Sequence, residues 1–155
     1  PVTANPAGAY GTARLLASSQ LPLRSDGGAW LLLRAGGSYA WGDYPFFEAA
    51  YLGGAETLRG FPRWRFAGDA AVYGAAEASH RLGRFRLIMN WDVDGHLFVD
   101  AGRVFLDGES SEKWHAAPGV GLSFNALDYR VSAAYAQGPK GRFYLETGLP
   151  LVRLR

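Results

Sequence analysis

The sequence lacks several features that would place it in familiar classes. It has no cysteine, which excludes a disulfide scaffold and a cysteine-based zinc site. Charged residues make up only 19%, and the net charge is +2 with the basic residues scattered, so no nucleic-acid-binding stripe is present. No run of about 18 apolar residues exists, which excludes a membrane-spanning helix. The first residues, Pro1–Gly11, have neither the basic nor the apolar region of a signal peptide.

The residues that are abundant narrow the class further. Glycine accounts for 21 of 155 residues, aromatic residues reach 14% and hydrophobic residues 48%. The length fits one domain or a piece of a larger one. High glycine, many aromatics, few charges and no cysteine are compatible with an outer-membrane β-barrel, and a soluble β-sandwich is the main competing fold.

Alternation of side chains with period two recurs along the chain, whereas helical spacing is rare. In residues 142–149, for example, Phe143, Leu145 and Leu149 share one face and Tyr144 and Glu146 the other. Seven strands are predicted on this basis, at residues 11–22, 29–41, 70–82, 97–105, 119–125, 129–137 and 142–149. Short connections join most of them, so the sequence predicts an all-β fold, an antiparallel meander.

The two faces of these strands differ in polarity. One face is apolar and includes Val120, Leu122, Phe124, Val131, Tyr135, Phe143 and Leu145; the other carries Arg14, Arg34, Glu77, Asp100, Arg142 and Glu146. Alternation alone fits either a sandwich or a membrane barrel with a polar lumen. Small residues within the strands and aromatic residues near their ends favour the transmembrane barrel, in which the apolar face contacts lipid.

One segment interrupts the meander and carries a recognisable pattern. Residues 42–69 are too long for a hairpin turn, and they contain Leu52-Gly53-Gly54, Arg59-Gly60-Phe61 and Arg65–Asp69. Glu77 follows on the next strand, and a Phe-x-Asp-x-Gly pattern at Phe98, Asp100 and Gly102 on the one after it. This ordered set resembles the signature loop of the BamA/TamA-type superfamily of outer-membrane barrels (bacterial surface antigens), over about residues 30–150.

The resemblance implies that the loop folds into the lumen and locks to the wall through Arg59, Gly60, Phe61, Glu77, Phe98, Asp100 and Gly102. The residue types agree with this. Two carboxylates on the polar face of neighbouring strands need a cation, and an arginine fork suits carboxylates. Gly60 permits a sharp turn, and we expect Phe61 to pack beside Gly102.

The chain also departs from the family, whose barrels are expected to have sixteen strands and soluble modules that bind client proteins. Seven strands predict that residues 1–155 are the C-terminal part of such a barrel. Seven strands should not close alone, so the open edges should pair with a missing upstream half or a second chain. Residues 84–94 supply an eighth strand only if Asn90–Gly95 is a tight turn. The end, Leu149–Arg155, lacks the family's terminal aromatic residue.

No pattern of enzymatic chemistry is present. His80, His96 and His115 lie on different segments without metal-ligand spacing, and no Gly-x-Ser-x-Gly nucleophile motif occurs. The acidic stretch Asp107–Glu112 lacks an EF-hand pattern, so a solvated loop is expected rather than a calcium site. We therefore expect a non-enzymatic protein with no metal and no cofactor.

The expected function is insertion or translocation of proteins at a bacterial-type outer membrane, with membrane lipid and client outer-membrane proteins as partners. The first alternative is a passive membrane anchor or pore for an upstream domain, which could be enzymatic. A third hypothesis is a soluble ligand-binding barrel of the lipocalin type.

Overall fold

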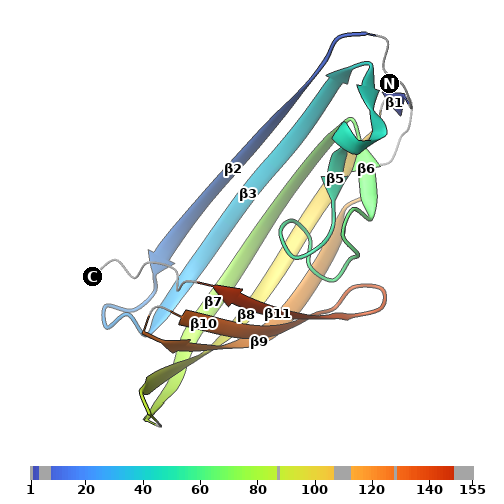
Figure 1. Cartoon of the computed structure of the whole chain (residues 1–155). Helices are drawn as coiled ribbons and strands as arrows, with labels where there is room; N and C mark the ends of the chain where they lie inside the picture. The colour runs from blue at the N-terminus through green and yellow to red at the C-terminus, as the bar shows by residue number, and fades with distance from the viewer. Residues whose placement is uncertain (1, 4–7, 87, 107–112, 128, 149–155) are drawn as a thin grey trace.

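The computed structural model describes residues 2–3, 8–86, 88–106, 113–127 and 129–148. Its main feature is one seven-stranded antiparallel sheet in the order β11-β10-β9-β8-β7-β3-β2 (Figure 1). The strands are β2 (Tyr10–Pro22), β3 (Ala29–Gly42), β7 (Ala70–Arg86), β8 (Asn90–Phe105), β9 (His115–Ala126), β10 (Tyr129–Ala136) and β11 (Arg142–Gly148). The predicted all-β antiparallel meander is confirmed.

The hairpin of β7 and β8 is longer than the sequence predicted. Residues 84–94 do not form an eighth strand, because Arg84 pairs with Asp92 and Arg86 with Asn90 at the end of this hairpin. The alternation seen at Arg84–Arg86 continues the period of β7 and does not begin a new strand. The hairpin therefore turns between Arg86 and Asn90, whereas an eighth strand would have required a tight turn at Asn90–Gly95.

The sheet curves into an open trough. In Figure 1, β9, β10 and β11 turn across the direction of the longer strands β2, β3 and β7, and the segment between β3 and β7 lies on the concave side. Within the described residues β2 and β11 are the outermost strands and do not pair with each other. The sheet is thus open, and closure into a barrel is not observed.

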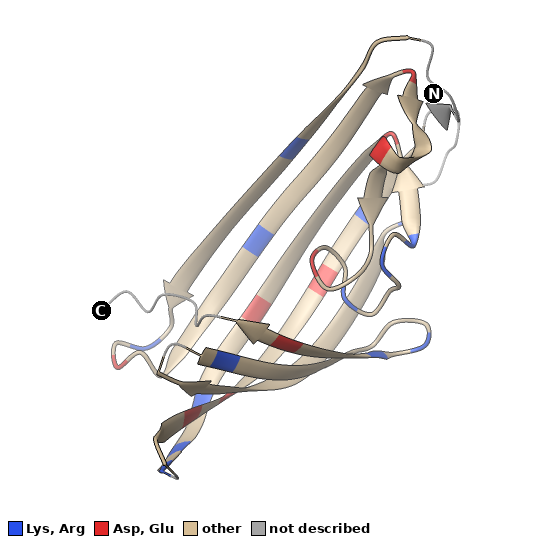
Figure 2. Cartoon of the chain, in the orientation of Figure 1, with Lys and Arg blue, Asp and Glu red and all other residues tan. Residues whose placement is uncertain are grey.

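Register places the charged residues that were predicted to face inward on the concave face. Charged positions recur within the strands (Figure 2), and Arg14, Arg34, Arg142 and Glu146 line cavities on this side. The alternate positions point the other way: Phe143 is 85% exposed and Leu145 76%. Val120, Leu122 and Val131 are also exposed on that face, whereas Phe124 and Tyr135 are half-buried.

The segment between β3 and β7 contains short regular elements. These are β4 (Tyr44–Pro45), the 3-10 turn η1 (Phe46–Glu48), β5 (Ala50–Leu52) and β6 (Phe66–Gly68), and β1 (Val2–Thr3) pairs in parallel with β4. The β5–β6 pair holds both ends of the loop that runs between them. The loop between β5 and β6 is therefore anchored at its base, although sequence periodicity gave no sign of these elements.

The main buried cluster joins this loop to the sheet. Leu52, Leu58, Phe61 and Ala117 form it, with Phe66, Tyr73 and Val104 packed against it. Among the residues described, no helix has the length and apolar character needed to cross a membrane.

Candidate functional site: a loop locked to the sheet

The loop between β5 and β6 is a compact turn closed by its own hydrogen bonds. Gly53 N–H donates to Thr57 Oγ1 at 2.9 Å, and Leu58 N–H donates to the carbonyl of Gly54 at 3.1 Å. Gly53 and Gly54 have φ angles of 123° and 93°, which favour glycine. These contacts hold Leu58 in the core and direct Arg59, the next residue, towards the sheet.

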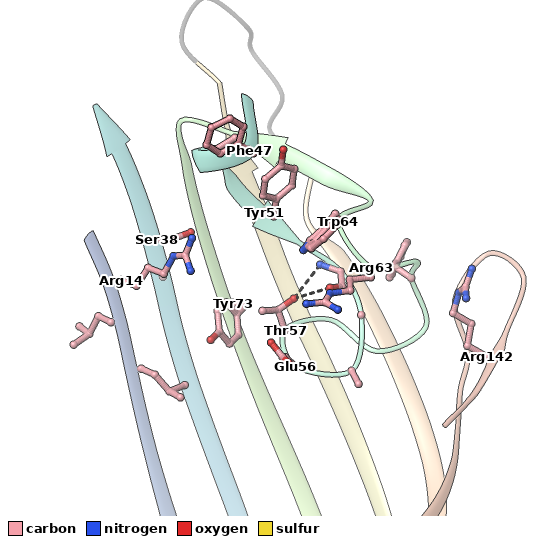
Figure 3. Close-up of a pocket in the computed structure, with 18 of the residues that line it drawn as sticks. Arg14, Ser38, Phe47, Tyr51, Glu56, Thr57, Arg63, Trp64, Tyr73 and Arg142 are labelled. Atoms are coloured by element: carbon pink, nitrogen blue, oxygen red, sulfur yellow. Dashed lines mark hydrogen bonds between the residues drawn. The ribbon is translucent and has the colours of Figure 1, made fainter. Parts of the chain in front are cut away.

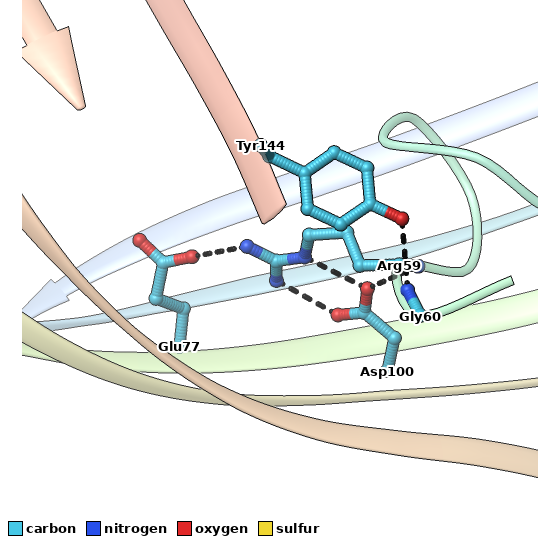
Figure 4. A network of polar contacts seen from close by, with 5 residues as sticks. All are labelled: Arg59, Gly60, Glu77, Asp100 and Tyr144. Atoms are coloured by element: carbon cyan, nitrogen blue, oxygen red, sulfur yellow. Dashed lines mark hydrogen bonds and ion pairs between the residues drawn. The ribbon is translucent and has the colours of Figure 1, made fainter. Parts of the chain in front are cut away.

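Arg59 bridges two carboxylates on neighbouring strands (Figure 4). Its Nε and Nη2 donate to Asp100 Oδ2 and Oδ1, both at 2.8 Å, in a bidentate fork, and Nη1 donates to Glu77 Oε2 at 2.9 Å. The backbone N–H of Arg59 also donates to Asp100 Oδ2 at 2.9 Å. Four charge-assisted hydrogen bonds thus tie one loop residue to β7 and β8.

The bridge is almost fully withdrawn from solvent. Relative exposure is 7% for Arg59, 9% for Glu77 and 1% for Asp100. The Arg59 guanidinium carbon lies 3.4 Å from the centroid of the Phe98 ring, which places the cation over an aromatic face. Each buried carboxylate therefore depends on Arg59 for charge compensation, and removal of the arginine would leave both uncompensated.

Gly60 brings the loop tip against the far side of the trough. Its N–H donates to the hydroxyl of Tyr144, on the edge strand β11, at 2.9 Å. Its φ is 89°, and an added Cβ would lie 2.8 Å from Cβ of Ala117. On Gly138 an added Cβ would lie within 1.9 Å of the Gly60 carbonyl oxygen. Glycine is required at positions 60 and 138 because the backbone of the loop tip lies directly against the backbone that follows β10.

Phe61 lies in the site, but not where the sequence placed it. Its ring packs against Phe66 and His115, with centroid distances of 5.3 and 5.5 Å. The space above Gly102 is filled by Leu52, whose Cδ2 would be 2.9 Å from an added Cβ. The predicted contact between Phe61 and Gly102 is therefore replaced by one from Leu52, because β5 brings Leu52 directly over β8.

The structure thus brings together Arg59, Glu77, Asp100 and Phe98 at the bridge, with Gly60, Phe61 and Gly102 in the surrounding contacts. Sequence reasoning missed Tyr144, Leu52 and Gly138. The alternation in 142–149 had placed Tyr144 on the polar face, which was a usable signal for its inward direction. Leu52 belongs to the Leu52-Gly53-Gly54 motif, but nothing in the sequence marked its contact with Gly102, and nothing marked Gly138. Both contacts join segments that are distant in the sequence.

The histidines have separate surroundings. His115 stacks on Phe66 at 3.9 Å between ring centroids, which gives this histidine a packing role. His96 is buried on the concave face, and His80 is exposed. Across the described ranges, no three acidic or histidine side chains are grouped so that they could hold a metal ion. The acidic stretch 107–112 and the end 149–155 lie outside the described residues.

This arrangement can hold a loop in one position inside the trough. At the bridge, the Arg59 guanidinium is hydrogen-bonded to both oxygens of Asp100 and to one oxygen of Glu77. No family model matches the sequence, and comparisons with curated proteins and with solved structures found no significant match.

Proposed function

We propose that this chain is the C-terminal part of an outer-membrane β-barrel that inserts or translocates proteins without enzymatic chemistry, at a bacterial-type outer membrane. The observation that carries the proposal is the loop held inside the trough by Arg59, on a sheet whose other face is apolar and exposed. We infer the insertion and translocation activity from the resemblance of the motif residues to those of BamA/TamA-type barrels.

The apolar face supports a lipid environment. Leu15, Leu97, Phe143 and Leu145 are each at least 65% exposed and occur on three different strands, β2, β8 and β11. Soluble monomers rarely expose contiguous apolar patches of such extent. Strands β2, β3, β7, β8 and β9 have 12 to 17 residues, and about 9–11 tilted residues suffice to cross a bilayer. Membrane lipid is therefore the proposed partner of this face.

The open edges support further strands as partners. Unpaired N–H and C=O groups cost several kcal/mol each in hydrocarbon, so β2 and β11 must pair with other backbone there. All six pairings in the sheet are antiparallel, so the two edge strands run in the same direction. A second copy inserted in the same orientation would meet them in parallel. An upstream barrel half with an odd number of strands would keep every pairing antiparallel, and is the favoured partner.

A reconstitution experiment distinguishes assembly activity from the alternative, a passive membrane anchor or pore. The chain, joined to the upstream strands that complete its barrel, is incorporated into liposomes, and a urea-denatured outer-membrane barrel protein is added as client. Folding of the client is followed by its resistance to SDS without heating. An assembly protein accelerates folding relative to empty liposomes, and Arg59→Ala reduces the acceleration while Arg65→Ala, an exposed arginine of the same loop, does not. Equal rates with and without the chain would favour the passive anchor or pore.

A further inference from the structure

One arginine, Arg103, lies on the apolar face of the sheet. On β8, Asp100 points inward to Arg59, so Arg103, three residues later in a regular register, points outward. Among the described residues of the seven strands, it is the one Asp, Glu, Lys or Arg with this orientation. The other charged strand residues face the trough, and Figure 3 shows Arg14 and Arg142 beside the cavity there.

The charge of Arg103 is not balanced by the part of the chain that the structure describes. The side chain forms no ion pair with these residues, and its Nε is withdrawn from solvent without a hydrogen-bond partner among them. Its guanidinium carbon lies 4.5 Å from the ring centroid of Phe105, so the side chain extends toward the end of β8. An arginine on a lipid-facing strand is destabilising unless it reaches the interface or an anion, so Arg103 requires an anionic partner.

An apolar groove of about 660 Å³ lies beside Arg103 on the same face. Its base is a row of small residues that pair in register across four strands: Ala17, Ala35, Gly74 and Ala101. The row covers three strand spacings, about 14 Å. Val72, the cross-strand partner of Arg103, also lines the groove, as does Trp114. The arginine therefore stands at the edge of a narrow apolar channel.

We propose that Arg103 and this groove bind one membrane lipid with an anionic phosphate head group, its acyl chain in the groove and its phosphate at the guanidinium. The proposal rests on the membrane barrel of the proposed function and adds a lipid chemistry to it. The guanidinium suits phosphate because its planar fork matches two phosphate oxygens. An apolar protein surface seated in the groove would leave the arginine without an anion.

The orientation of the two parts agrees with that of a lipid in a bilayer. The guanidinium extends toward the strand end, where Phe105 is an exposed aromatic residue, and aromatic residues mark the membrane interface in barrels. The groove at Ala101 lies closer to the middle of β8. A head group at the interface and a chain below it therefore meet the arginine and the groove in the same order.

Quenching of Trp114 fluorescence by brominated lipids tests the site, because Trp114 lines the groove and is 57% exposed. The chain, joined to the upstream strands that complete its barrel, is placed in phosphatidylcholine nanodiscs with increasing fractions of phosphatidic acid or phosphatidylcholine that carry brominated chains. The Trp114 signal is the difference between wild type and Trp114→Phe. We expect half-maximal quenching at a roughly fivefold lower fraction of phosphatidic acid, as for one arginine beside an anionic lipid.

Three variants separate the charge from the groove. Arg103→Gln should abolish the preference for phosphatidic acid while both lipids still quench. Arg86→Gln, which alters an exposed arginine at the far end of β7, is the matched control and should keep the preference. Gly74→Leu fills the groove where an added Cβ meets only the carbonyl oxygen of Arg34 at 3.6 Å, so it should reduce quenching by phosphatidic acid.

Equal quenching by the two lipids would overturn the lipid site and leave the proposed membrane barrel intact. The same holds for an equal loss of preference in Arg103→Gln and Arg86→Gln, or for unchanged quenching in Gly74→Leu. No quenching by either lipid would overturn both proposals, because Trp114 would then not contact the bilayer.

Discussion

Replacement of Arg59 by alanine tests the bridge that holds the loop. The substitution removes three side-chain hydrogen bonds and leaves Glu77 and Asp100 buried without a cation. Breaking a buried ion pair by removal of one partner costs about 3–5 kcal/mol. The backbone N–H at position 59 still donates to Asp100, so we take the lower end, about 3 kcal/mol. The open population of the loop should then rise roughly 150-fold, since about 1.4 kcal/mol is tenfold.

Hydrogen exchange of the segment 53–66 measures this opening directly. Exchange in Arg59→Ala should be faster by about two orders of magnitude, while strands β2 and β3 keep their protection. Arg65→Ala is the matched control, because Arg65 is exposed in the same segment and forms no ion pair among the described residues. Equal exchange in the two variants would refute the reasoning.

A compensating variant separates the loss of charge balance from a general defect. Adding Glu77→Gln and Asp100→Asn to Arg59→Ala removes the uncompensated carboxylates. Because the largest cost comes from buried unpaired charge, the triple variant should be closer to wild type in its unfolding midpoint in detergent than Arg59→Ala alone. Arg59→Lys should recover only part of the stability, since an ammonium cannot form the bidentate fork.

Three further substitutions test the close contacts of the loop. Gly60→Ala places a Cβ 2.8 Å from Ala117 at a positive φ, and it should expose the loop to proteolysis without unfolding the sheet. Tyr144→Phe leaves the Gly60 N–H without its partner and should cost about 1–3 kcal/mol of loop docking, measured by exchange at that amide. Gly102→Ala would push into Leu52 and should lower the midpoint of thermal unfolding in detergent; an unchanged midpoint would contradict the contact.

The meander could be predicted from the sequence because register on a half-polar sheet is strongly specified by alternation. The motif residues also indicated that Arg59 meets Glu77 and Asp100, since parity put both carboxylates on one face. The predictions that failed concern contacts between residues that are distant in the sequence. Leu52 takes the place above Gly102 because the β5–β6 pair sets the position of the loop, and short strands of three residues leave no period to detect.

The end of the β7–β8 hairpin failed for a different reason. Alternation fixes which face a residue takes, but not where a long strand turns, so residues 84–94 matched a separate strand as well as a hairpin end.

The most direct test of the account is the environment of alternate residues on β11. Spin labels at Phe143 and Leu145, which are exposed on the apolar face, are compared with labels at Tyr144 and Glu146, which line the concave side. In liposomes we expect the first pair to be accessible to oxygen dissolved in the bilayer, and the second pair to a water-soluble nickel complex. Equal access of the nickel complex to all four positions would contradict a membrane barrel with a polar lumen.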